Sequence, residues 1–106
     1  MRTIDFIIRK AKNDKSVLAV ALFGSYARGE PHKDLDLCIF LIPQKYTNKE
    51  LSHKKMEYLQ DDERYDVQVF QQLPIYIQIR ILKEAKILYC KNEDDLYDMY
   101  FKTLQD

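Results

Sequence analysis

Two short groups of residues could do chemistry, and they lie close together in the first third of the chain. Gly24-Ser25 ends an apolar run, and Asp34-Leu35-Asp36 follows after eight intervening residues. Glycine lets a phosphate approach the backbone closely, and the free N–H groups at the start of a helix favour an anion. Paired carboxylates hold magnesium, which also binds substrate phosphates. Together the two groups indicate a site for a nucleoside triphosphate and its metal ions.

The glycine–serine pair stands where a predicted strand, residues 17–23, gives way to a short predicted helix, residues 25–28. The Ser25 hydroxyl could donate to a phosphate at the helix start, and Arg28, one turn later, could reach the same anion. The alternative is an ordinary helix-capping serine with a solvated Arg28, and the Gly-Ser pair taken alone favours that alternative.

Asp34 and Asp36 begin the next predicted strand, residues 34–42. Because side chains alternate along a strand, both carboxylates project from the same face, about 7 Å apart. Two carboxylates so close repel each other unless a cation lies between them. The alternative is a solvated strand start, but Asp36 already lies within an apolar run, which favours a metal site.

A third carboxylate, Asp66, lies in a segment of alternating polar and apolar residues, 65–70, which predicts another strand. Asp66, Gln68 and Phe70 share one face of that strand. If it pairs with residues 34–42, Asp66 completes a cluster of three carboxylates. The pairing itself does not follow from the sequence.

Residues 23–30, Phe-Gly-Ser-Tyr-Ala-Arg-Gly-Glu, followed by Asp34-Leu35-Asp36-Leu37, resemble the signature of the minimal nucleotidyltransferases (MNT). This family belongs to the DNA polymerase β-like nucleotidyltransferase superfamily and includes the antitoxins of HEPN/MNT toxin–antitoxin pairs. Asp66 falls where the family carries its third aspartate, and the resemblance covers most of the chain. It implies an α/β (α+β) fold of the polymerase β palm type, in which helices flank a mixed sheet.

The resemblance also implies a Mg²⁺-dependent transfer of a nucleotide, most simply AMP from ATP, to a hydroxyl of a partner protein. Two magnesium ions would be held by a catalytic set of aspartates: Asp34, Asp36 and Asp66. The triphosphate would be held by Gly24, Ser25 and Arg28. Asp66 would also help to deprotonate or orient the acceptor. In the family, the described acceptor is a tyrosine of the HEPN toxin, an RNase that AMP transfer silences.

The loop between the two motifs departs from the family pattern, because its eight residues are fewer than usual and Lys33 replaces a common serine. A shortened loop could shift the triphosphate relative to the metals. This leaves open an alternative in which the protein neutralises its partner by binding alone. Transfer to a small molecule would use the same residues, but we expect no additional substrate-binding domain in this chain.

The composition is that of a small globular protein. We expect one domain over residues 1–106, and the seventeen basic residues balance the seventeen acidic ones, which offers little attraction for nucleic acid. No apolar stretch reaches the ~20 residues of a membrane span. Cys38 and Cys90 lack the spacing of a metal pair, and we expect buried, reduced thiols and a cytoplasmic location. Self-association stays open.

The remaining elements are predicted as helices over residues 3–13, 47–60 and 94–104 and a strand over 86–90. Thr47 and Glu50 form a capping box that opens the second helix, whose thin apolar face predicts a surface position. Residues 74–82 alternate with period two, yet Ile75, Ile79 and Leu82 would share a helical face, and the family resemblance favours the helix. The apolar side chains of the last helix could belong to the core or to a partner interface.

Overall fold

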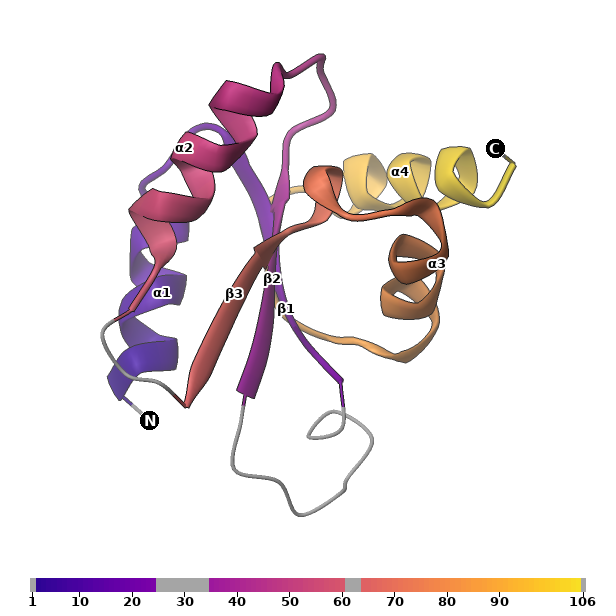
Figure 1. Ribbon diagram of the computed structural model, residues 1–106. Coiled ribbons are helices and arrows are strands. Elements are labelled where there is room, and N and C mark those ends of the chain that lie inside the picture. Colours follow the sequence, from indigo (N-terminus) through magenta and orange to yellow (C-terminus); the bar gives the residue numbers. More distant parts are fainter. Residues whose placement is uncertain (1, 25–34, 61–63, 106) are drawn as a thin grey trace.

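The computed structural model describes residues 2–24, 35–60 and 64–105 and contains a four-stranded mixed sheet with helices on both faces (Figure 1). The strands lie in the order β3-β2-β1-β4. Strand β1 is antiparallel to both of its neighbours, and β2 and β3 are parallel. The elements along the chain are α1 (Arg2–Lys12), β1 (Val17–Phe23), β2 (Leu35–Leu41), α2 (Asn48–Tyr58), β3 (Tyr65–Val69), the 3₁₀ turn η1 (Phe70–Gln72), α3 (Ile75–Glu84), β4 (Lys86–Cys90) and α4 (Glu93–Gln105).

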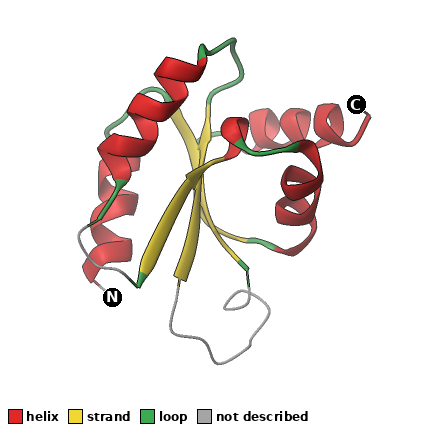
Figure 2. Cartoon of the chain, viewed as in Figure 1, coloured by secondary structure: helices red, strands yellow, loops and turns green. Residues whose placement is uncertain are grey.

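Helices α1 and α2 cover one face of the sheet, and α3 and α4 cover the other (Figures 1 and 2). The central strands β1 and β2 are apolar on both faces because each face meets a helical layer. Alternate side chains of β2 therefore enter different cores. Leu37 and Ile39 pack toward α1 and α2, whereas Cys38 and Phe40 pack toward α3 and α4. This assignment of faces decides which way Asp36 projects.

The sequence predicts most element boundaries to within one or two residues. The predicted capping box is confirmed: the Glu50 N–H donates to the Thr47 hydroxyl at 3.1 Å, and the Thr47 N–H donates to the Glu50 carboxylate at 2.9 Å. Helix α2 lies on the surface, as its thin apolar face predicts. It buries Leu51 and the whole of Tyr58 in the core beneath α1.

Residues 75–84 form a helix, as the family resemblance favours, and Leu82 of the apolar face packs against the core. Ile81 is buried and Ile77 packs against the same core, whereas Ile75 is 45% exposed. A helical repeat fixes which residues share a face but not which face meets the sheet. Pro74 caps the helix rather than occupying its first turn, and its carbonyl accepts from the N–H groups of Ile77 and Gln78.

The last helix divides its apolar residues between core and solvent. Leu96 and Met99 pack on the sheet, while Tyr97, Phe101 and Leu104 stay exposed. Both cysteines are free thiols, with Cys38 buried as expected and Cys90 only partly so. Within the described ranges, the longest and most apolar helices still fall short of what crossing a membrane requires.

Candidate functional site

Three chain segments meet at one end of the sheet, where β1 ends and both β2 and β3 begin (Figure 1). In the register of the sheet, Asp36 lies beside Phe23 of β1 on one side and beside Asp66 of β3 on the other. The Leu35 N–H donates to the Arg64 carbonyl at 2.7 Å, which fixes the two parallel strands where they start. The pairing that the sequence left open is therefore present, and it places Asp36 and Asp66 side by side.

Both carboxylates project from the face that α3 and α4 cover. Their neighbours Leu37 and Val67 enter the core under α1 and α2, and side chains alternate, so Asp36 and Asp66 must point the other way. Asp36 is partly buried and Asp66 is exposed. Partners in register point to the same side of a sheet, and neighbouring strands lie about 4.8 Å apart. The two carboxylates thus form one acidic position that is open to solvent.

The backbone at Gly24 lies directly against the Asp36 carboxylate. Its φ of 83° lies in the left-handed region, which residues with a side chain rarely adopt. A Cβ built on Gly24 would lie 2.3 Å from Oδ2 of Asp36, far inside van der Waals contact. The absent side chain therefore lets the backbone turn pass directly over a carboxylate. A turn and a carboxylate that lie this close can bind the same ligand.

The site as predicted is only partly described. Ser25, Arg28 and Asp34 lie outside the described residues, so their placement in the site stays a prediction. Within the described ranges, no group of three or more His, Cys, Asp or Glu side chains is arranged to hold a metal ion. Asp36 and Asp66 supply two of the three predicted carboxylates, and a full cluster would require Asp34.

One neighbour of the site was not recognised from the sequence as a functional residue. The Gln68 side-chain amide donates to both oxygens of Asp66, at 3.2 and 3.4 Å. The sequence did indicate that Gln68 and Asp66 share one face, because they are two residues apart in a strand.

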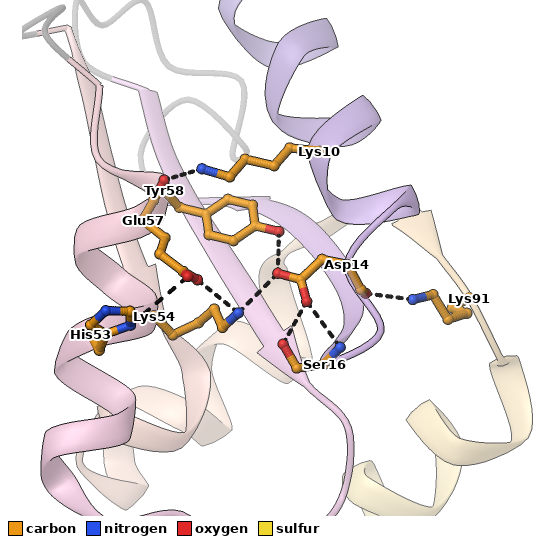
Figure 3. A network of polar contacts seen from close by, with 8 residues as sticks. All are labelled: Lys10, Asp14, Ser16, His53, Lys54, Glu57, Tyr58 and Lys91. Carbon is orange, nitrogen blue, oxygen red and sulfur yellow. Dashed lines mark hydrogen bonds and ion pairs between the residues drawn. The ribbon is translucent and has the colours of Figure 1, made fainter.

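A second polar cluster surrounds Asp14, in the turn that precedes β1 and hence at the opposite end of that strand from Gly24 (Figure 3). The Asp14 carboxylate accepts hydrogen bonds from the Ser16 hydroxyl at 2.7 Å, from Tyr58 at 2.9 Å and from Lys54 at 3.0 Å. Lys54 also pairs with Glu57 at 2.7 Å. These contacts tie the α1–β1 turn to helix α2.

The charges of this cluster are mutually satisfied. Burial by itself raises the pKa of Asp14, but the hydrogen bonds from Ser16, Lys54 and Tyr58 outweigh it and hold that pKa well below its usual range. Burial likewise lowers the pKa of Lys54, but Glu57 and Asp14 more than compensate and raise it overall. Lys91 donates to the Asp14 carbonyl at 2.7 Å and brings the start of the α4 connection to the same turn. The cluster is thus a structural clamp rather than a binding site.

Comparison with known proteins identifies the family and agrees with the fold. Residues 5–94 match the family model described as "Polymerase beta, Nucleotidyltransferase". A Methanocaldococcus jannaschii protein, named as a candidate protein adenylyltransferase, is 31% identical over 88 residues. That alignment covers 81% of this chain and 66% of the relative, so the chain spans just under two thirds of its length.

Solved structures share the fold. One chain of a toxin–antitoxin complex crystallised with AMP-PNP superposes with a TM-score of 0.69 at 20% identity, covering 98% of this chain and 83% of that one. The complex of a tri-AMPylated Shewanella oneidensis HEPN toxin with its MNT antitoxin gives a TM-score of 0.65 at 16% identity, covering 98% of this chain and 80% of that one. The predicted mixed sheet flanked by helices is confirmed, as is the resemblance to the minimal nucleotidyltransferases. The chain belongs to the polymerase beta nucleotidyltransferase family.

Proposed function

We propose that the protein transfers AMP from ATP, with Mg²⁺, to a hydroxyl of a partner protein, and that the partner is a helical HEPN-type toxin. The observation that carries this proposal is the contact between the Gly24 turn and Asp36, with Asp66 beside it. It puts a backbone turn able to approach phosphate next to carboxylates able to hold a metal ion. The named relative and the toxin–antitoxin neighbours support the protein acceptor.

The donor set fits magnesium, because carboxylate oxygens together with substrate phosphates are what this ion prefers. Asp36 and Asp66, with Asp34, would hold it, and Gly24, Ser25 and Arg28 would hold the triphosphate. Bound magnesium would neutralise the triphosphate and stabilise the attacking and leaving oxygens.

The residues of this protein and the hydroxyl of its partner carry out the transfer itself. The acceptor oxygen attacks the α-phosphorus, pyrophosphate leaves, and the hydroxyl proton passes to the exposed Asp66 carboxylate or to water. The Gly24 turn orients the triphosphate for this in-line displacement.

The first prediction is transfer of label from α-labelled ATP to a helical partner protein, dependent on added Mg²⁺. Asp66→Asn should abolish most of the labelling, because the carboxylate is lost while the side-chain shape is kept. Gln72→Leu is a matched control, since Gln72 lies just after the same strand and bonds to Ser52 of α2 rather than to a carboxylate. Labelling is followed by gel and mass spectrometry.

A result in which the partner binds but no nucleotide yields label would contradict the proposal and favour neutralisation by binding alone. Label that appears on a small molecule and never on a protein would instead show that the acceptor is wrong. A cytoplasmic location, as expected from the sequence, is part of the same proposal.

A further inference from the structure

Hydrogen bonds connect three side chains, Lys55, Gln68 and Asp66, in a row that passes around the edge strand β3. Lys55 of α2 donates to the Oε1 atom of Gln68 at 3.3 Å. The Nε2 atom of the same amide donates to the two oxygens of Asp66 at 3.2 and 3.4 Å. Lys55 and Gln68 are partly buried, and Asp66 is exposed. The row therefore links a helix on one face of the sheet to a carboxylate on the other.

The order of charges along this row fixes the orientation of the amide. An ammonium group can only donate and a carboxylate can only accept, so the amide oxygen must face Lys55 and the amide nitrogen must face Asp66. With the amide reversed, the hydrogen bonds at both ends of the amide would be lost, since two donors would face each other at one end and acceptors at the other. Lys55 thus holds Gln68 in the one orientation that presents N–H groups to Asp66.

We propose that Gln68 is a positioning residue, which Lys55 orients and which holds the Asp66 carboxylate in place for metal binding and transfer. This inference rests on the proposed function. A strand fixes the Cα and Cβ atoms of Asp66, but the rotation of an exposed carboxylate is otherwise free. A residue that bonds to a metal ligand commonly changes metal affinity or activity by about 10- to 100-fold when it is removed.

Gln68→Leu and Gln68→Glu separate positioning from simple packing. Leucine is similar in size and removes the hydrogen bonds to Lys55 and to Asp66. Glutamate keeps the acceptor for Lys55, and so keeps the tie between α2 and β3, but it cannot donate to Asp66. Positioning predicts that both variants lower kcat by roughly tenfold, with a KM for ATP that changes much less, because the triphosphate turn is at Gly24. Lys55→Met should lower kcat less, by roughly threefold. Gln72→Leu should leave it unchanged.

A second measurement needs neither metal nor nucleotide. In the NMR spectrum of the free protein, the side-chain amide signals of Gln68 should shift in Asp66→Ala and in Lys55→Met, while those of Gln72 stay in place. Gln68 signals that respond to neither substitution would overturn the inference. So would a Gln68→Glu protein with wild-type kcat, since that result would leave Gln68 only a packing role.

The outcomes distinguish this inference from the proposed function. If Asp66→Asn is inactive while both Gln68 variants transfer label at the wild-type rate, the function stands and the positioning role is wrong. If the wild-type protein transfers no nucleotide to any acceptor, the proposed function fails and the positioning role fails with it. Thermal unfolding of each variant confirms that a lost rate is not lost folding.

Discussion

The aspartates near the two ends of strand β1 have different surroundings. Asp14, before the strand begins, accepts from Ser16, Lys54 and Tyr58, and its charge is balanced by protein groups (Figure 3). At the other end, Asp36 and Asp66 lie side by side, under a glycine turn, on a face that reaches solvent. A carboxylate whose charge is already balanced can stabilise a fold but has little to offer a ligand. Asp36 and Asp66 are adjacent carboxylates at one end of the sheet, and two carboxylates this close suit a cation-binding site.

Asp36→Asn should have the largest effect on transfer, because it keeps the shape of the side chain and removes its charge. We expect transfer to fall by at least about 100-fold, because a metal ligand contributes several kcal/mol to the stability of the transition state. The melting temperature should change little, since Asp36 is not part of either apolar core. Initial rates of labelling, with a melting curve as control, measure both effects.

Gly24→Ala tests the contact between the turn and the carboxylate. The left-handed backbone should cost alanine about 1–2 kcal/mol, and the new Cβ would push against Asp36. We expect both lower stability and slower transfer, by up to about 100-fold if the carboxylate moves by an ångström. Urea unfolding and labelling per folded molecule separate the two. A variant as stable and as active as the wild type would show that the close contact between the Gly24 turn and Asp36 matters neither for folding nor for transfer.

Asp14→Ala is expected to act on stability alone. It leaves the buried Tyr58 hydroxyl and Lys54 without a shared acceptor, which should lower the free energy of unfolding by roughly 1–3 kcal/mol. Transfer per folded molecule should not change, because Asp14 lies at the far end of β1. A loss of transfer without a loss of stability would break the distinction between the two ends.

The stabilisation by Asp14 should also depend on pH. Folding holds the pKa of Asp14 below its ordinary value of 3.8, so the folded protein favours the ionised form. The stabilisation is therefore complete above about pH 4 and is lost as the pH falls through the lower, folded pKa. The difference in unfolding free energy between wild type and Asp14→Asn should be largest near neutral pH and should shrink in acid. Urea titrations across pH 2–7 measure it.

Most of the helices and strands could be predicted from local sequence patterns. The apolar run at residues 17–23, the Thr47–Glu50 capping box and the strand at 86–90 are each decided by neighbours in sequence, and all appear as predicted. Periodicity does not fix the rotation of a helix against a sheet, so the sequence did not indicate that Ile81 would be the buried residue of α3. The resemblance to a known family, rather than propensity, decided the prediction of a helix over residues 74–82.

The two ends of β1 differ in how far the sequence could predict them. Asp36 and Asp66 were proposed from strand alternation, and their pairing followed once β3 was found next to β2. The clamp joins Asp14 to Tyr58, 44 residues apart, and no local pattern indicates such a contact. Gln68 was placed on the correct face, but its link to Lys55 depends on how α2 packs, which only the folded chain shows.

The decisive measurement is the rate of labelling by Asp36→Asn and by Asp14→Asn, each divided by its folded fraction, because it shows whether transfer takes place at the Asp36 end of the sheet. We expect Asp36→Asn to abolish transfer in a stable protein and Asp14→Asn to transfer at the wild-type rate in a less stable one. Equal activity of Asp36→Asn and wild type would contradict the claim that this end of the sheet is where nucleotide transfer takes place.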